Sequence, residues 1–426
     1  MPDGLAYLRW TRLSSLCSRA DPAGRLIPPH TRLDLSMISP TAPSAPGSPT
    51  EPKIAVFTPD LGSGGCERMS LFITQSLVEG GLNVDLIVSH MAGVLVDHPV
   101  ARKHGVDMGG DGVWAVKPLL EYYRRERPQL IIAVGRTAKF VAGIANQIEP
   151  SLPFVISVRG VLERPRLSRF WPRAIFGHVP ERWLYRRAVA AQATLQAMSD
   201  QVEHAFDVPA ERVATIHNPL TIDRPESPFP PEHEGWFDRP VIVNAGRLDT
   251  QKDQAGLIRA FAGAGLKDRA RLLILGVGPF EEKLRRQARQ LGMEDALILA
   301  GFVPDVRPYL ERSTGFALSS VHESFGLVLL EALACGLPVA SYDCPTGPRE
   351  LLDGGRLGRL IQPGDEAALG QAMVDMIDGR LAAPEPADVE RHLERFAPAE
   401  IASQWVAFVR QCLVWLDEDA DPRHAA

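Results

Sequence analysis

The sequence predicts an α/β protein with two doubly wound, Rossmann-like domains that face a central cleft, and a C-terminal helix that crosses back. Short apolar runs alternate with helical patterns in two successive series, which is typical of β-α-β units in mainly parallel sheets. A proline-rich segment at residues 223–236 separates the series and has the composition of a hinge. The length of 426 residues is also suited to two domains.

Composition limits the classes of function. The net charge is −6, with 46 basic and 52 acidic residues, which excludes a dedicated nucleic-acid binder. No apolar run is long enough to span a membrane. The five cysteines form no C-x-x-C pair, which argues against a disulfide framework or a zinc site. These features favour a cytoplasmic protein.

The N-terminal segment, residues 1–52, is expected to be a disordered tail. Proline, serine and alanine dominate Ser39–Pro52. Residues 1–36 contain five arginines and no apolar stretch, so no secretory signal is predicted. We expect residues 1–36 to be dispensable, with an arginine-rich targeting peptide as the alternative.

The first domain is expected at residues 53–222 and begins with the strand KIAVFTP. A glycine loop, LGSGGCER, follows at residues 61–68, and a helical pattern covers Ser70–Val78. The further strands predicted here are NVDLIV and the segments 129–134, 153–158, 194–197 and 213–216.

The second domain is expected at residues 237–396. Its predicted strands are 240–245, 271–275, 296–300, 315–319, 338–342 and 357–361. Its predicted helices are 253–264, 280–291, 325–335 and 365–376. An amphipathic helix at 399–412, within a segment expected at 397–415, should pack back on the first domain. An acidic tail is expected at residues 416–426.

Two glutamates mark the most informative segment, residues 322–351. Glu323 precedes a predicted helix and Glu331 lies eight residues further on, inside it. Between them, Phe325–Val328 supply free backbone amides at a helix N-terminus, which favours an anion. One use of such an arrangement is to contact a sugar while the amides hold its phosphate. The alternative is an exposed helix face.

Two cations mark a second loop. A predicted strand ends at Gly246, and Arg247 and Lys252 follow it. Two positive charges at the carboxyl end of a strand suit a diphosphate whose charge must be neutralised. The alternative is a pair of solvated loop side chains.

The glycine loop at residues 61–68 does not match a dinucleotide-binding fingerprint. It lacks the third glycine, and no acidic residue ends the second strand. An NAD-dependent oxidoreductase is therefore disfavoured. The loop permits close approach to a ligand, and a plain tight turn explains it equally well.

Taken in order, these motifs resemble those of family 4 retaining glycosyltransferases of the GT-B fold. The resemblance covers roughly residues 53–415. It rests on the first-loop pattern GGCERMSLFITQSLVEGGLNVDLIV, with Cys66 where alanine is usual. It also rests on NAGRL…QKD, LGVGP, GFV-D, ESFGLVLLEALACGLPVAS and DCPTGPREL. The last form occurs in members that build surface polysaccharides and glycolipids.

The resemblance implies a role for each site residue. Arg247 and Lys252, beside Gly246, would bind the donor diphosphate, and Glu323 would contact the donor sugar. Glu331 would bind the ribose hydroxyls, and the amides of Phe325, Gly326 and Leu327 would hold the distal phosphate. Gly64 and Gly65 would bind the donor by lining the acceptor-side loop close to the diphosphate. Arg159, where many relatives carry a histidine, and Asn218 would lie on the acceptor side, although Asn218 also reads as a turn-initiating Asn-Pro.

The resemblance further implies retention of configuration. Cations and helix-terminal amides can stabilise the departing diphosphate, and no D-x-D motif follows a strand, so metal-independent catalysis without a cofactor is expected. A uridine diphosphate sugar is the favoured donor. The alternatives are a nucleotide-sugar epimerase of the same fold and a catalytically degenerate scaffold subunit.

A basic segment predicts a membrane-linked acceptor. Residues 159–192 hold eight arginines and two acids, so this segment carries +6 in a chain of −6. The aromatic residues interleaved with them are Phe170, Trp171, Phe176, Trp183 and Tyr185. Such a pattern suits the surface of an anionic bilayer, and hence a lipid-linked glycan acceptor met at the inner membrane face. The alternatives are a solvated loop and a grip on a soluble anionic acceptor.

Overall fold

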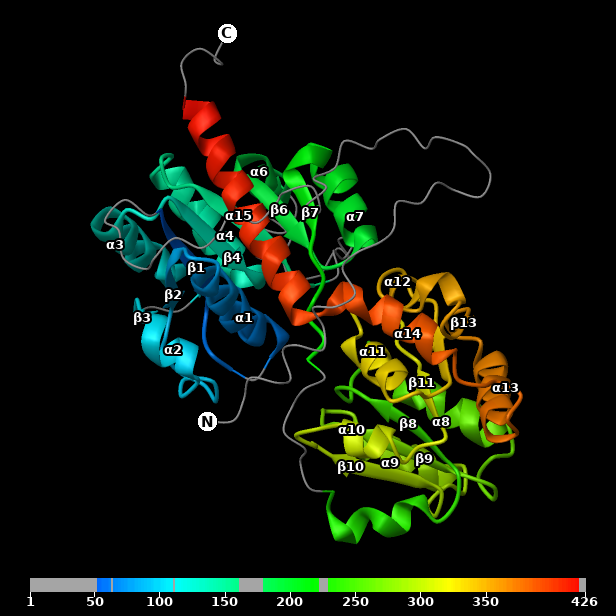
Figure 1. The fold of residues 1–426 in the computed structure, drawn as a ribbon. Coiled ribbons are helices and arrows are strands. Elements are labelled where there is room, and N and C mark those ends of the chain that lie inside the picture. Colours follow the sequence, from blue (N-terminus) through cyan, green and yellow to red (C-terminus); the bar gives the residue numbers. More distant parts are fainter. Residues whose placement is uncertain (1–51, 63, 110–111, 161–178, 222–228, 421–426) are drawn as a thin grey trace, which may run out of the picture.

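The computed structural model describes residues 52–62, 64–109, 112–160, 179–221 and 229–420. Figure 1 shows two α/β bodies joined by crossing segments, with the long C-terminal helix α15 lying along the first body. The expected tail at residues 1–51, most of the basic segment and residues 222–228 of the linker lie outside the described residues.

The first body is built on a seven-stranded sheet in the order β3-β2-β1-β4-β5-β6-β7. All its neighbouring strands are parallel. Its strands are β1 (Lys53–Thr58), β2 (Asn83–Val88), β3 (Gly105–Asp107), β4 (Leu130–Val134), β5 (Phe154–Val158), β6 (Ala190–Ala193) and β7 (Val213–Thr215). Its helices are α1 (Gly65–Glu79), α2 (Pro99–His104), α3 (Val116–Glu126), α4 (Gly135–Ile148), α6 (Val179–Arg187) and α7 (Gln196–Phe206), with short 3₁₀ turns at η2 (Gly112–Ala115) and η3 (Ala210–Arg212).

The second body is built on a six-stranded parallel sheet in the order β10-β9-β8-β11-β12-β13. Its strands are β8 (Val241–Ala245), β9 (Arg271–Leu275), β10 (Leu297–Gly301), β11 (Gly315–Leu318), β12 (Val339–Tyr342) and β13 (Arg359–Ile361). Its helices are α8 (Gln254–Gly263), α9 (Glu281–Gln290), α10 (Arg307–Leu310), α11 (Leu327–Ala334), α12 (Pro348–Leu351), α13 (Glu366–Ile377) and α14 (Pro386–Leu393). The 3₁₀ turns η4 (Pro231–Phe237), η5 (Asp353–Gly355) and η6 (Glu394–Phe396) complete it.

Both sheets reverse their strand order beside the first strand, which is the doubly wound arrangement that the alternating pattern predicts. The central strands are buried on both faces, because helices cover each side of the sheet. The fold class expected from the sequence is therefore confirmed.

One predicted strand is wrong. The strand expected at 194–197 lies four residues earlier, in the alanine-rich segment of β6, and Leu195 is already the N-cap residue of α7. Thr194 and Leu195 have the higher strand propensity. However, small residues fit the fully buried position between β5 and β7, and this packing overrides local preference.

The C-terminal helix α15 (Pro398–Ala420) continues through residues 416–420, where an acidic tail was expected. Its inner face packs on α1: Arg410 donates to the carbonyl of Gly80 at 3.1 Å, and Trp405 and Phe408 are fully buried. Because this packing holds the helix along its length, its acidic end stays helical for five further residues.

The second half of the hinge predicted at 223–236 is not a linker. Residues 231–237 form the 3₁₀ turn η4, where His233 stacks on Trp236 and bonds the hydroxyl of Tyr309 at 3.0 Å. Arg312 lies over the ring of Phe229 at 4.2 Å. The second half of the predicted hinge is thus part of the second body.

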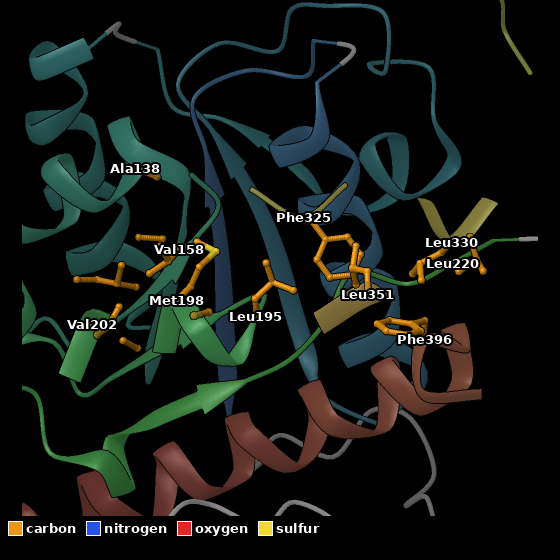
Figure 2. Close-up of a cluster of buried hydrophobic side chains, with 14 of the residues drawn as sticks. Ala138, Val158, Leu195, Met198, Val202, Leu220, Phe325, Leu330, Leu351 and Phe396 are labelled. Atoms are coloured by element: carbon orange, nitrogen blue, oxygen red, sulfur yellow. The ribbon is translucent and has the colours of Figure 1, made fainter. Parts of the chain in front are cut away.

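The two chain crossings between the bodies contact each other. The amide of Leu220, in the first crossing, donates to the carbonyl of Phe396, in the second, at 2.8 Å. Figure 2 shows Phe325 and Leu351 of the second body beside Leu220 and Phe396. His217 packs on the ring of Phe396 at 5.0 Å. An apolar cluster therefore runs from the first body into the second.

Candidate active site

The predicted donor-binding loops lie at one edge of the second sheet. Strands β8 and β11 are neighbours, so the loops that follow them meet at their carboxyl ends. The amide of Val321 donates to the carbonyl of Gln251 at 2.8 Å, and the Ser319 hydroxyl donates to the carbonyl of Lys252 at 2.8 Å. These bonds hold the two loops against each other.

Lys252 and Glu323 form an ion pair across these loops. The Lys252 ammonium lies 2.6 Å from Oε2 of Glu323 and also contacts Oε1. The Glu323 side chain is only 6% exposed and that of Lys252 is 20% exposed. Two side chains that are 71 residues apart in sequence are therefore adjacent, as expected if both handle one ligand.

The loop that carries Lys252 is shaped by its own residues. The Asp249 carboxylate accepts from the amides of Gln251 and Lys252 at 3.0 and 3.2 Å, which forms a tight turn. Gly246 leaves room for the lysine, because a Cβ there would lie 3.2 Å from its Cε. The neighbouring turn at Gly276 packs directly on the backbone of Gly246. A Cβ at Gly276 would lie 2.0 Å from the carbonyl oxygen of Gly246.

Arg247 lies at the rim of this edge. Its side chain is 73% exposed, and its Nε is 3.9 Å from a carboxylate oxygen of Asp249. It is therefore free to swing toward a ligand, unlike Lys252, which is held by Glu323.

The Glu323 loop ends at the N-terminus of α11. Gly326 is the N-cap residue with φ of 95°, and no side chain caps the helix. The amides at Phe325, Gly326 and Leu327 therefore include donors that the helix leaves unpaired, which suit an anion. The Phe325 ring is buried and packs on Phe396, which anchors this loop.

Glu331 lies in α11, one turn from its start at Leu327. It is half-buried and close to Cys335, whose pKa is raised to about 12, mainly by burial and additionally by the carboxylates of Glu311 and Glu331. Glu323 therefore lies in the loop before α11 and Glu331 within the helix, so the two carboxylates are held by different elements.

Gly64 and Gly65 open helix α1 in the first body. Gly64 is the N-cap residue, and no side chain caps the helix. A Cβ at Gly64 would lie 2.4 Å from the Glu67 carboxylate, whereas the space at Gly65 is open. The second half of the predicted glycine loop is thus the first turn of a helix.

Arg159 and Asn218 contact each other. The guanidinium donates to Asn218 Oδ1 at 2.7 Å, to Ser157 Oγ at 2.9 Å and to Gln192 Oε1 at 3.1 Å. Burial lowers the pKa of Arg159 to about 10. The sequence reasoning missed Gln192, because the strand that carries it was placed four residues too late.

A cavity of about 650 Å³ lies where the two bodies meet. None of the predicted site residues lines it. Its lining residues are Gln196, Thr215, His217, Glu350, Glu394, Arg395, Glu400 and Gln404. The sequence reasoning did not single out Glu350 within the segment DCPTGPREL, because nothing local indicates a partner in the other body.

Two family models match the chain, one in each body. The model described as Glycosyltransferase Family 4 matches residues 63–224, and the model described as Glycosyl transferases group 1 matches residues 239–379. The first body therefore carries a glycosyltransferase family 4 domain and the second body a group 1 glycosyl transferase domain. These matches confirm the resemblance inferred from the ordered motifs.

Curated relatives of this chain have names from glycan biosynthesis. One is the N-acetylgalactosamine-N,N'-diacetylbacillosaminyl-diphospho-undecaprenol 4-alpha-N-acetylgalactosaminyltransferase of Campylobacter jejuni, 36% identical over 32% of this chain and 37% of the relative. The lipopolysaccharide core biosynthesis glycosyltransferase LpsE of Rhizobium meliloti is 25% identical over 74% of this chain and 86% of the relative. In the Campylobacter protein and two further relatives the aligned region spans 37%, 44% and 26% of their length, so this chain aligns with less than half of each.

Among solved structures, the Anabaena protein Alr3699/HepE in complex with UDP-glucose superposes with a TM-score of 0.70. It is 21% identical, and the superposition covers 84% of this chain and 99% of the HepE chain. The shared architecture is the GT-B fold.

Over the described residues, no cluster of three or more His, Cys, Asp or Glu side chains is arranged to hold a metal ion. Within the same part of the chain, no helix has both the length and the apolar character that crossing a membrane requires.

Proposed function

We propose that this protein is a retaining glycosyltransferase that moves a sugar from a nucleotide-diphosphate sugar to a hydroxyl group of a lipid-linked saccharide. The observation that carries the proposal is the Lys252–Glu323 pair, set beside the uncapped N-terminus of α11. A cation and free amides suit the diphosphate of a donor, and a carboxylate suits its sugar. All three lie together at the carboxyl ends of β8 and β11.

The proposed mechanism gives each group one task. Lys252 and Arg247 neutralise the charge that develops on the departing diphosphate, and the amides at Phe325–Leu327 stabilise its distal phosphate. Glu323 orients the donor sugar, and Glu331 binds the ribose hydroxyls. The bond between the anomeric carbon and the phosphate oxygen breaks as the acceptor oxygen attacks from the same face. The acceptor proton passes to a phosphate oxygen of the leaving group.

The donor and acceptor classes rest on the relatives. A uridine diphosphate sugar is supported by the HepE structure, which is a complex with UDP-glucose. A lipid-linked saccharide is supported by the Campylobacter relative, whose name contains diphospho-undecaprenol.

The test is an acceptor-dependent assay. The purified chain is incubated with UDP-, GDP- and ADP-sugars, with and without a lipid-linked saccharide, and free nucleotide diphosphate and product are measured. We expect nucleotide release with a UDP-sugar to depend on the acceptor, and NMR of the product to show the anomeric configuration of the donor. Acceptor-independent conversion of the donor sugar would indicate the epimerase alternative, and inversion would contradict the mechanism.

Chelation provides a further prediction. Because side-chain cations and helix amides neutralise the diphosphate in this proposal, transfer should persist in excess EDTA within about twofold of the untreated rate. The measurement is the initial rate after EDTA treatment, with and without added Mg²⁺ or Mn²⁺. Complete loss that either ion restores would show the metal-independent mechanism to be wrong.

The prediction that the basic segment, residues 159–192, meets a bilayer is wrong for two of its residues. Tyr185 is buried and stacks on Phe206 at 4.1 Å, and Arg159 is held by Asn218, so neither is available to a bilayer. Arg187 donates to Asn146 at 2.7 Å. Arg182 and Arg186 remain exposed, at 57% and 61%, with the single carboxylate of Asp207 near both. Residues 161–178 lie outside the described residues.

We propose that Arg182 and Arg186 contribute to binding an anionic bilayer. The variant R182S/R186S should bind liposomes rich in anionic lipid about 30-fold more weakly than the unchanged protein, since each nearby cation contributes about 1 kcal/mol. Co-sedimentation at increasing salt measures this, and binding of the unchanged protein should fall as the charges are screened. The control R285S/R289S, on α9 of the second body, should bind normally. Liposome binding that does not depend on lipid charge would contradict the proposal. These arginines would then be structural or would contact a soluble acceptor.

A further inference from the structure

Helix α7 of the first body receives its N-terminal cap from the second body. Its own N-cap residue, Leu195, provides no side-chain hydrogen bond. The amide of Gln196 donates instead to Oε2 and Oε1 of Glu350, at 2.9 and 3.2 Å. A carboxylate at this position satisfies an amide that the helix leaves unpaired and opposes the positive end of the helix dipole. Glu350 itself belongs to α12.

The Glu350 side chain is mostly buried at this junction, with 18% exposed. Its nearest ring is that of His217, with Nε2 at 3.7 Å. His217 donates from Nδ1 to the carbonyl of Thr194 at 2.8 Å, and burial lowers its pKa to about 4, so it is neutral at pH 7. The backbone amides of Gln196 and Ala197 at the start of α7 are therefore the hydrogen-bond partners of the Glu350 carboxylate, and the Arg395 side chain also stabilises its charge.

Glu350 also lies on the segment that supports the donor loop. The Thr346 hydroxyl donates to the carbonyl of Glu323. Gly347 has φ of 98° and packs so closely that a Cβ there would lie 2.5 Å from the carbonyl oxygen of Phe325. Residues 346–350 thus contact the donor loop with one end and α7 with the other.

A second contact joins the donor loop itself to the first body. The Thr194 hydroxyl, two residues before α7, donates to the carbonyl of Ser324 at 3.2 Å. The Glu350 cap and this bond act on adjacent points of both bodies, so together they fix how α7 faces the Glu323 loop.

We propose that Glu350 is a positioning residue for transfer, which holds the first body at the separation from the donor loop that acceptor attack requires. This inference rests on the proposed function. The groups assigned to donor diphosphate and sugar belong to the second body, so donor binding does not need the cap. Attack by an acceptor bound to the first body does need it, because small errors in placement lower the rate steeply.

The experiment compares E350A and E350Q with E400Q. Glu400 lines the same cavity, but its described hydrogen bond is from Gln404 in its own helix. We expect kcat of E350A to fall about tenfold, the scale of losing one helix cap, while the Kd of the donor stays within about twofold. E350Q, which keeps an acceptor oxygen, should fall less, and E400Q should match the unchanged protein. Small-angle scattering should give a larger radius of gyration for E350A.

Scattering needs no activity, so it tests the positioning role even if the proposed function is wrong. Absence of transfer by the unchanged protein with every donor and acceptor would contradict the proposed function alone. Unchanged scattering together with unchanged kcat in E350A would overturn the positioning role. Equal losses of donor binding and kcat would also overturn it, because Glu350 would then merely support the donor loop. Should circular dichroism show E350A unfolded, E350M, which keeps the length of the side chain but has no oxygen to accept from the Gln196 amide, carries the same comparison.

Discussion

Replacing Lys252 by alanine is expected to lower kcat for sugar transfer by about 100-fold or more. This is the scale of removing one preorganised charge from a developing anion. Lys252 is the cation held at the strand edge by Glu323, whereas Arg247 is exposed at the rim and cannot take the same position without moving. Steady-state kinetics with the donor identified by the screen measures the effect. The control K267A removes an exposed lysine of the same body and should leave kcat unchanged.

The same variant should also lose stability, in contrast to what a loop lysine suggests. K252A leaves the Glu323 carboxylate, which is 6% exposed, without its counter-ion. Breaking such a pair from one side costs about 3 kcal/mol of unfolding free energy. The double variant K252A/E323Q removes the buried charge as well, so denaturant unfolding should show most of the stability restored while transfer stays low. Near-normal transfer by a folded K252A would refute the role assigned to this lysine.

Replacing Glu323 by glutamine is expected to lower kcat by on the order of 100-fold with little change in nucleotide binding. The amide keeps the shape of the side chain but loses the charge that orients the sugar and holds Lys252. Lys252 is 20% exposed and can turn toward water, so E323Q should cost less stability than K252A. Calorimetric binding of the nucleotide diphosphate, compared with kcat, separates the two effects.

E331Q is the matched comparison for this variant. It removes the other glutamate of the same segment, which is assigned to the ribose hydroxyls, so its nucleotide Kd should rise more than its kcat falls. Equal losses of nucleotide binding and turnover in E323Q would assign Glu323 a role in supporting the loop rather than in catalysis.

Local sequence patterns were sufficient for most elements of the fold. Runs such as KIAVFTP and NVDLIV are apolar over the length of a strand, and helical patterns with turn residues separate them, so few alternatives remain. The pattern failed at β6, where four residues of low strand propensity are held by neighbours on both sides. It also failed at β3, a three-residue edge strand with too few residues to show a period.

The order of the donor-side motifs could likewise be read from the sequence, because each consists of a glycine turn or a charged residue directly after a strand. Their pairing could not. That Lys252 contacts Glu323 depends on β8 and β11 being neighbours in the sheet, although β9 and β10 separate them along the chain.

The sequence by itself determined the two doubly wound domains and the resemblance to a glycosyltransferase family, since these depend on local periodicity and on motifs with short spacing. The residues proposed to handle a donor are predicted from the same motifs. Only the tertiary structure decided which partners these residues have. Arg159 bonds Asn218, Tyr185 is buried against Phe206, and Glu350 caps a helix in the other body. These contacts join residues that are 59, 21 and 154 positions apart. They form only when strand order and domain packing bring distant segments together, and no local pattern records that.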